Sequence, residues 1–367
     1  MKKYRNIIVG AGITGITIAE RLAASGEEAL IIEKRDTIGG NCHDYFDEEG
    51  NYIQLFGPHI FHTDHGDVWH YLNNFSRFNE YSHRVLCSIN NRLINIPFNM
   101  NSVELAFDKD KAAIINGILL KELGPGKKVP ILELKDHREP LVRELADYVY
   151  KNIFLNYTVK QWDLKPDEMD PSVTARVPVY ISRDDRYFQS KWQGIPEKGF
   201  TEMFNNMLKN PAIEKLLATD YKTAIQNIGF EKMYYTGPLD YYFDYKYGRI
   251  KYRKIRLEFE KKEMSSYQEN SVINYPNDND FTRITEFNKF LFIKNRNTVT
   301  AKEYASWDNG FEAYPVQTPE NLEIVGKYVN EVGKLDNVKF IGRLAECKYY
   351  DIDTGIKNVL DKFNPNA

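Results

Sequence analysis

Residues 7–15 read IIVGAGITG, and residues 29–33 read ALIIE, a second apolar run that ends in an acid. An apolar run followed by glycines and then by a helix-forming stretch predicts a strand, a tight turn and a helix. In such a unit the glycine backbone can lie close to a pyrophosphate, and the helix N-terminus offers N–H groups and the positive end of its dipole. The sequence therefore predicts a nucleotide-binding β–α–β unit.

The glycine turn and the acid carry this prediction. We expect Gly10, Gly12 and Gly15, together with Thr14 in the same turn, to contact the cofactor. Glu33 closes the second strand, where a carboxylate accepts hydrogen bonds from a ribose. The alternative is a tight turn that binds nothing, and the ordered succession of strand, turn, helix, strand and acid disfavours it.

A second glycine pair narrows the cofactor. Residues 34–41 read KRDTIGGN, which places Gly40 and Asn41 shortly after the acid. This feature resembles the FAD proteins with two dinucleotide-binding motifs more than it resembles NAD dehydrogenases. We therefore expect FAD, and the competing interpretation is an ordinary Gly-Gly turn.

Composition indicates a globular protein without a general affinity for polyanions. At 367 residues the chain is long enough for two or three domains. Its 49 basic and 52 acidic residues leave a net charge of −3, which predicts no nucleic-acid partner and no attraction to an anionic membrane. The 25 tyrosines suit carbohydrate or nucleotide binding, although most of them are expected to pack in the core.

The N-terminus imitates a secretory signal, because basic residues precede an apolar stretch. Glycines interrupt that stretch, and no run of about 18 apolar residues occurs elsewhere, so we expect no membrane insertion. The chain has 3 cysteines, far apart and without metal-binding spacing, which suits a reducing compartment. The expected location is cytoplasmic.

Periodicity along the chain predicts an α/β protein with three parts. Helical spacing dominates from residue 101 to about 162, and alternating apolar residues predict antiparallel strands at about 176–190 and 247–305. We expect a discontinuous FAD-binding Rossmann-like domain with an inserted helical domain and an antiparallel β-sheet domain. Their expected bounds are 1–80, 212–245 and 316–367 for the FAD-binding domain, 101–170 for the helical domain, and 81–100, 171–211 and 246–315 for the sheet and substrate domain.

Two histidines and two arginines are candidates for chemistry. His59 and His62 could begin a metal site, but no third ligand cluster of suitable type lies nearby, so we expect no metal and place His59 against the flavin. Arg176 and Arg283 occur in otherwise apolar strands, where an arginine is often one half of a structural ion pair. If both face one cleft, their planar guanidinium groups suit a diphosphate.

Several longer motifs together resemble the bacterial UDP-galactopyranose mutases. The similarity runs from the first strand to about residue 351, and only the segment around 103–145 matches poorly. The motifs are GGN at 39–41, HIFHT at 59–63, NIPFNMN at 95–101, YTVKQW at 157–162, YTGP at 235–238, GRLAE at 342–346 and KYYD at 348–351.

The resemblance implies a flavin-dependent isomerase that converts UDP-galactopyranose to UDP-galactofuranose without net redox change. In that family N5 of reduced FAD attacks the anomeric carbon and expels UDP, which gives a covalent sugar adduct. The family also implies a homodimer and a product used for cell-surface polysaccharide biosynthesis. The absence of an obvious hydrolytic triad fits a cofactor that is itself the nucleophile.

Roles for individual residues follow from the same resemblance. Arg176 and Arg283 match the arginines that clamp the diphosphate, and His59, followed by Ile60, matches the histidine against the flavin. The remaining matched positions are Tyr187, Tyr314 and Tyr349 at the phosphates, Thr158, Trp162 and Asn274 around the substrate, Tyr157 at the uracil, and Arg343, Tyr350, Asp351 and Ile352 at FAD.

Departures from the family pattern leave the preferred substrate open. His83 stands where asparagine is usual, Ala313 replaces the first of two tyrosines, and Tyr180 replaces an arginine. The alternatives are a mutase acting on dTDP-fucopyranose or UDP-N-acetylgalactosamine and, in another class, an amine-oxidase-like flavin oxidoreductase. His59 favours the plain galactose substrate, because family members that accept the N-acetylated sugar tend to carry arginine there.

Overall fold

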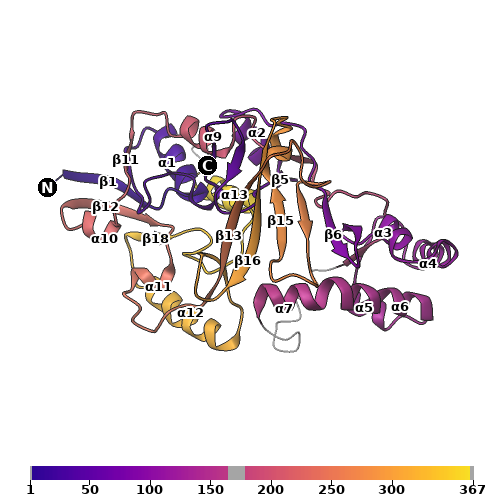
Figure 1. Cartoon of the computed structure of the whole chain (residues 1–367). Helices are drawn as coiled ribbons and strands as arrows, with labels where there is room; N and C mark the ends of the chain where they lie inside the picture. The colour runs from indigo at the N-terminus through magenta and orange to yellow at the C-terminus, as the bar shows by residue number, and fades with distance from the viewer. Residues whose placement is uncertain (1, 164–177, 364–367) are drawn as a thin grey trace. The chain divides into compact units, whose positions relative to one another are not determined.

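The computed structural model describes residues 2–163 and 178–363, and the chain divides into two compact units. Each unit is assembled from segments that are far apart in the sequence (Figure 1). The first unit comprises Met1–Tyr81, Ser190–Tyr252 and Glu312–Ala367, and the second comprises Ser82–Gln189 and Arg253–Phe311.

A parallel sheet of five strands, in the order β11-β2-β1-β12-β18, lies at the centre of the first unit. Ile7 and Ile8 of the central strand are completely buried, as expected for a parallel strand covered on both faces. The chain leaves β1 for β2 on one side, whereas β12 and β18 lie on the other side, and ligands bind at such a switch point. The bounds are β1 (Lys2–Val9), β2 (Ala29–Ile32), β11 (Ile213–Leu216), β12 (Ile228–Tyr235) and β18 (Val338–Phe340).

Helices and two pairs of short strands complete the first unit, and β1, α1 and β2 confirm the β–α–β unit predicted at the N-terminus. No helix among the described residues is long and apolar enough to cross a membrane. The remaining elements are α1 (Ile13–Ala24), η1 (Gly40–Cys42), β3 (Asp44–Phe46), β4 (Tyr52–Gln54), β5 (Phe61–Thr63), α2 (Gly66–Asn73), β10 (Trp192–Gly194), α9 (Phe200–Met207), α10 (Tyr221–Ala224), α11 (Leu239–Tyr242), α12 (Pro319–Val332) and α13 (Ile352–Lys362).

The second unit contains strands that neighbour one another in the order β13-β16-β15-β14-β6-β7. Their pairing is antiparallel as predicted, except that β14 and β6 run parallel. Among the described residues of the segment predicted as strand at 176–190, only β9 is a strand, and it pairs with β8. The bounds are β6 (Val85–Ile89), β7 (Arg92–Ile96), β8 (Lys128–Pro130), β9 (Pro178–Tyr180), β13 (Tyr252–Lys262), β14 (Val272–Asn274), β15 (Arg283–Glu286), η4 (Phe287–Leu291) and β16 (Thr298–Ser306), and β17 (Phe311–Pro315) follows.

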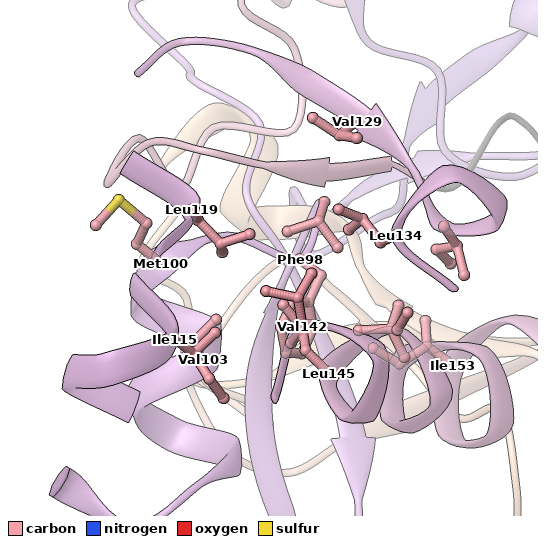
Figure 2. Packing of buried hydrophobic residues seen from close by; sticks show 14 of the residues in the cluster. Phe98, Met100, Val103, Ile115, Leu119, Val129, Leu134, Val142, Leu145 and Ile153 are labelled. Carbon is pink, nitrogen blue, oxygen red and sulfur yellow. The ribbon is translucent and has the colours of Figure 1, made fainter. Parts of the chain in front are cut away.

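The predicted helical segment is also in the second unit. Its helices enclose an apolar cluster, and Leu145 and Val142 of one helix point into the cluster (Figure 2). A π-helical stretch joins this helix to the next, so residues 140–162 form one continuous rod. The bounds are α3 (Met100–Ala106), α4 (Lys109–Glu122), α5 (Ile131–Lys135), α6 (Pro140–Val149), η2 (Tyr150–Leu155) and α7 (Asn156–Trp162).

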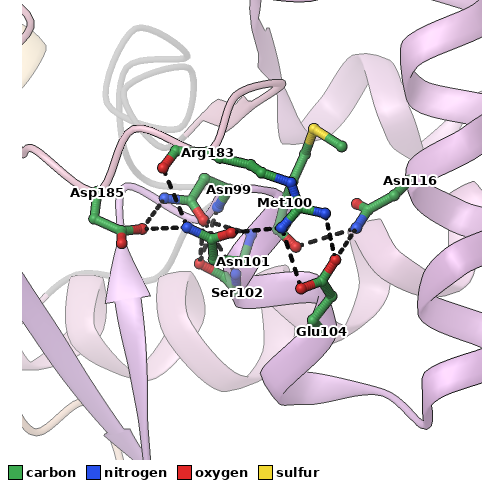
Figure 3. Close-up of polar contacts among 8 residues, drawn as sticks. All are labelled: Asn99, Met100, Asn101, Ser102, Glu104, Asn116, Arg183 and Asp185. Atoms are coloured by element: carbon green, nitrogen blue, oxygen red, sulfur yellow. Dashed lines mark hydrogen bonds and ion pairs between the residues drawn. The ribbon is translucent and has the colours of Figure 1, made fainter.

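A polar network fixes residues 183–185 against the start of α3 (Figure 3). The Asn99 side chain caps α3 and forms a capping box with Ser102. Its amide nitrogen also donates to Asp185 Oδ1 at 2.9 Å, and Asn101 Nδ2 donates to the same oxygen at 3.0 Å. These side-chain bonds give the segment partners other than a strand ladder, which explains why the strand predicted here is short.

The two units differ in one respect from the three domains expected from the sequence. The helices of 101–163 and the strands of 253–306 share a unit, and residues 190–211, expected in the sheet domain, lie in the first unit. The division into three functional domains therefore remains a prediction.

Leu145→Ala tests the apolar cluster. Leu145 is completely buried, so the substitution removes apolar contacts and leaves a cavity. We expect the free energy of unfolding to fall by about 2–5 kcal/mol, measured by urea unfolding. Leu132→Ala is the matched control, because Leu132 is 43% exposed. Equal losses in the two variants would contradict the role given to the cluster.

Candidate functional site

Three glycines form the turn between β1 and α1. Gly10 has a φ of +104°, and a Cβ on it would lie 2.2 Å from Thr236 Oγ1. A Cβ on Gly15 would lie 2.0 Å from the carbonyl oxygen of Gly10. Gly12 is the N-cap of α1. Gly10 and Gly15 are therefore required for steric reasons, and the turn brings the N–H groups of a helix N-terminus to the end of β1.

The second glycine pair lies directly against the first turn. Gly39 N donates to Ala11 O at 2.8 Å, and Gly12 and Gly39 form an isolated β-bridge. A Cβ on Gly40 would lie 2.9 Å from Gly12 Cα. We call this pair of touching turns, residues 10–15 and 39–40, the glycine cradle. Side chains would fill the cradle, so its form fits a ligand such as a pyrophosphate that needs close approach to backbone.

Glu33 is buried beside the cradle. Its carboxylate accepts hydrogen bonds from Ala11 N at 2.7 Å and Arg35 N at 2.9 Å. The carboxylate therefore supports the first turn, and the ribose contact predicted for it would be made by the same group. The sequence motif identified the residue but not its bond to the turn.

Arg35 is a neighbour that the sequence analysis missed. Its Nη2 donates to Asn41 Oδ1 at 3.3 Å, and its guanidinium carbon lies 4.2 Å from the centre of the Phe56 ring. Arg35 therefore contacts both Phe56 and Asn41, a residue predicted to bind the cofactor. The basic residues after Glu33 were visible in the sequence, but their direction depends on how the loop folds.

The C-terminal residues predicted to bind the cofactor also lie near the first turn. A Cβ on Gly342, just before Arg343, would lie 3.1 Å from Thr14 Oγ1. The helix α13 packs against α1, and Asp351 is its N-cap. Residues from both ends of the chain therefore meet at the N-terminus of α1, as the cofactor prediction requires.

Arg343 and Tyr350 have defined partners. The Arg343 guanidinium carbon lies 4.8 Å from the centre of the Tyr349 ring. Burial raises the pKa of Tyr350 to about 12, and a hydrogen bond with Glu346 acts in the same direction. Tyr349 itself is 50% exposed.

His59 has its ring orientation fixed by a local hydrogen bond. His59 Nδ1 lies 2.9 Å from Gly57 O. A carbonyl oxygen can only accept, so Nδ1 carries the proton, and in the neutral ring Nε2 is an acceptor. Ile60 follows at the end of this loop, immediately before β5.

His62 belongs to a different environment from His59. Its Nδ1 lies 3.2 Å from Ser190 Oγ, and burial lowers its pKa, although Asp351 and Asp353 act in the opposite direction. Within residues 2–163 and 178–363 no group of three or more His, Cys, Asp or Glu side chains could hold a metal ion. His59 and His62 thus make separate local contacts.

In the second unit, three of the predicted substrate residues lie on α7, namely Tyr157, Thr158 and Trp162. Lys160 of the same helix donates to Tyr275 O at 2.8 Å, directly after Asn274 at the end of β14. This bond connects α7 to the end of β14. The predicted substrate positions on α7 and β14 therefore belong to one connected region.

Arg283 lies opposite Asn274 on the neighbouring strand β15. Its Nε donates to Glu303 Oε2 at 2.8 Å, and Glu303 is 2% exposed. The structural ion pair considered for Arg283 is thus present, and it fixes the plane of the guanidinium. Glu303 was missed, because its partnership depends on the pairing of β15 with β16.

A buried arginine, also missed, anchors the end of α7. Arg253 Nε donates to Gln161 O at 2.7 Å and its Nη2 to Lys160 O at 3.2 Å. Its guanidinium carbon lies 4.6 Å from the centre of the Trp307 ring. The alternating strand around Arg253 predicted a strand residue and gave no indication of this contact.

His83 and Tyr187 lie together in the second unit. Tyr187 N donates to His83 O at 2.7 Å, and their ring centres are 5.6 Å apart. His83 is 5% exposed and is also stacked near Phe188. The unusual histidine is therefore part of an aromatic cluster with a predicted phosphate-contacting residue.

The other predicted substrate residues are placed less fully. Arg176 lies outside the described residues. Tyr314 and Ala313 are on β17, and Tyr314 and Tyr349 belong to the first unit. Tyr180 ends β9, where its N–H donates to Phe98 O at 2.7 Å.

Residues 152–349 match the family model of UDP-galactopyranose mutase, and residues 8–75 match that of an NAD(P)-binding Rossmann-like domain. Together these matches imply a flavin cofactor and a sugar-nucleotide substrate.

Individual relatives are similar over nearly their whole length. The chain is 34% identical to a probable UDP-galactopyranose mutase of Klebsiella pneumoniae, covering 98% of this chain and 94% of the relative. It is 32% identical to a dTDP-fucopyranose mutase of Escherichia coli, covering 97% and 96%. A crystal structure of a reduced UDP-galactopyranose mutase shares the fold, with a TM-score of 0.73 at 14% identity, covering 99% of this chain and 94% of that one.

Gly15→Ala tests the glycine cradle. The added Cβ would collide with the carbonyl oxygen of Gly10, so we expect the purified protein to lose the visible absorbance of bound flavin. Gly326→Ala is the control in the same unit, because a Cβ there meets nothing within 4 Å on α12. In an exposed helix this control should stabilise by about 0.5–1 kcal/mol. Normal flavin content in Gly15→Ala would contradict the steric account.

Proposed function

The chain belongs to the UDP-galactopyranose mutase family, and from this premise we propose that it converts UDP-galactopyranose to UDP-galactofuranose with reduced FAD. The structural observation that carries the proposal is the glycine cradle at the N-terminus of α1, with the Glu33 carboxylate beside it. A dinucleotide is the ligand class that uses both the close backbone and an acid near its ribose.

When bound, reduced FAD supplies the nucleophile, so the chain needs no activated side chain for this step. The three cysteines are all buried, which agrees with a reaction in which no cysteine is the nucleophile. Burial raises the pKa of both the Cys42 and Cys87 thiols to about 12, which keeps them protonated and unreactive. The protein's own task is to orient the sugar nucleotide and to neutralise the departing UDP.

Arg283 is the described residue best suited to that neutralisation. Its guanidinium is held by the buried Glu303 carboxylate, so it is oriented before the substrate arrives. Arg176 is proposed as the second cation at the diphosphate. Two planar cations can follow the charge that develops on a leaving diphosphate.

His59 is proposed to lie against the flavin. Its ring is fixed by the hydrogen bond that Nδ1 donates to Gly57 O, so the imidazole has one orientation relative to the loop.

Two alternatives remain as outcomes of a substrate test. The similarity to an Escherichia coli dTDP-fucopyranose mutase makes dTDP-fucopyranose a candidate substrate for this chain. His83 and Ala313 are positions at which the chain departs from the usual family pattern. UDP-N-acetylgalactosamine is the other candidate sugar nucleotide. An amine-oxidase-like activity would instead consume oxygen and release hydrogen peroxide.

A homodimeric assembly and a cytoplasmic location are also proposed from the resemblance. Sedimentation velocity tests the first, because a dimer of this 42.9 kDa chain is readily distinguished from a monomer. Fractionation of the source cells tests the second.

The decisive experiment compares the two redox states of the flavin. We expect dithionite-reduced protein to form UDP-galactopyranose from UDP-galactofuranose under anaerobic conditions, and oxidised protein to form little, because reduction makes the flavin nucleophilic. Product is followed by chromatography, with dTDP-fucofuranose and UDP-N-acetylgalactofuranosamine assayed in parallel. Equal turnover in both redox states, or peroxide formation without prior reduction, would refute the proposal.

Arg283→Ala should lower turnover by about 10²–10³-fold while FAD remains bound, because it removes one contact to the leaving diphosphate. The matched control is Arg256→Ala, an arginine of the same sheet that pairs with the exposed Glu258. Steady-state kinetics of the reduced proteins compare them. Arg176→Ala is expected to behave like Arg283→Ala, and near-normal turnover in both would return these arginines to a structural role.

A further inference from the structure

A chain of buried hydrogen bonds runs through the first unit to the loop that carries His59. Tyr52 OH donates to Asp44 Oδ2 at 2.5 Å, and Gln54 Nε2 donates to Tyr52 OH at 3.0 Å. Tyr52, Gln54 and Asp44 are 0%, 1% and 3% exposed. Polar groups buried this deeply are costly unless they are hydrogen-bonded, so the chain specifies one arrangement.

Gln54 grips the main chain of His59 at both of its polar atoms. His59 N donates to Gln54 Oε1 at 2.7 Å, and Gln54 Nε2 donates to His59 O at 2.9 Å. The bend before His59 contains Gly57, with a φ of +87°. The glutamine therefore fixes the backbone of a turn whose side chain is expected to face the flavin.

Asp44 anchors the other end of the chain. Its carboxylate accepts hydrogen bonds from Phe200 N at 2.6 Å and Thr201 N at 2.8 Å, the first N–H groups of α9. A Cβ on Gly199 would lie 2.9 Å from Asp44 Oδ2, so the carboxylate is tightly enclosed. Burial raises the pKa of Asp44, and its hydrogen-bond donors oppose that rise.

The hydrogen bonds of this chain follow one direction. The Tyr52 hydroxyl donates to the Asp44 carboxyl group, and its oxygen accepts from the Gln54 amide nitrogen. That leaves Gln54 Oε1 to accept from His59 N. The bonds to Tyr52 and to the main chain of His59 therefore require the same orientation of the Gln54 amide, and Asp44 joins this chain to the N-terminus of α9.

We propose that Gln54 is a positioning residue for His59, with Tyr52 and Asp44 holding Gln54 in its working orientation. The inference rests on the proposed function, because His59 is expected to contact the flavin. A displacement of about 1 Å in a reacting geometry can cost about 10²-fold in rate. A residue that acts only through His59 should therefore alter turnover and the flavin environment without altering the binding of the sugar nucleotide.

Two variants and a matched control test the proposal. Gln54→Leu removes both bonds to His59, and Tyr52→Phe removes one oxygen while keeping the buried ring. Tyr71→Phe is the control, because Tyr71 is a buried tyrosine of the same unit whose hydroxyl donates to the Glu20 carboxylate at 2.7 Å. All three variants lose buried hydrogen bonds, but only the first two lose bonds of this chain.

Each protein is compared after loading with FAD. We expect Gln54→Leu to lower kcat by about tenfold with KM nearly unchanged, and Tyr52→Phe to show a smaller loss of the same kind. The absorption bands of the bound flavin should shift in both, and ¹⁵N spectra of labelled histidine should show the His59 ring losing its single tautomer. Tyr71→Phe should match the wild type in all three readouts.

Activity of the wild type tests the proposed function, and the difference between the variants tests the positioning role of Gln54. If the reduced wild type isomerises its substrate but Gln54→Leu and Tyr52→Phe both behave like Tyr71→Phe, the positioning role of Gln54 is overturned. If the wild type fails to isomerise its substrate, the proposed function is refuted. A shift of the flavin absorption bands found only in Gln54→Leu and Tyr52→Phe would still support the positioning of His59 by Gln54. If Gln54→Leu does not fold, Tyr52→Phe decides the question with the same readouts.

Discussion

The candidate functional site depends on the close contact between the two backbone turns of the glycine cradle. Gly12 and Gly40 approach so closely that a Cβ on the second would lie 2.9 Å from the Cα of the first. This contact brings the loop after β2 against the N-terminus of α1, and the same loop leads through η1 into β3 and Asp44. One close contact therefore underlies both the proposed dinucleotide site and the start of the hydrogen-bond chain to His59.

In the second unit, two arginines are held by contacts with buried protein groups. Glu303 is almost completely buried, and its partner is the arginine proposed to meet the diphosphate. Removing one partner from a buried ion pair leaves an uncompensated charge, so the ion pair with Glu303 holds Arg283 in place. Arg253 is another internal cation, bonded to main-chain carbonyls at the end of α7. Both arginines combine a structural contact with a place among the predicted substrate positions.

The sequence predicts those parts of the structure that depend on local patterns. The turn at Gly10–Gly15 and the helical stripe through Leu145 were predictable because steric demand and periodicity lie in a few consecutive residues. Glu303 and Gln54 were not, because their roles depend on strand pairing and on a loop that returns to β4. The prediction of a strand around residue 185 was wrong, because Asp185 accepts a hydrogen bond from Asn99 at the start of α3. Such contacts join residues far apart in the sequence, so a local sequence pattern does not predict them.

A crystal structure of the protein loaded with FAD would locate the cofactor relative to the glycine cradle. We predict that the pyrophosphate lies at the N-terminus of α1, within hydrogen-bond distance of the backbone between Gly12 and Thr14, with a ribose at Glu33. We also predict that the isoalloxazine ring lies against His59. A dinucleotide bound away from the glycine cradle, or a flavin with no contact to His59, would contradict the account.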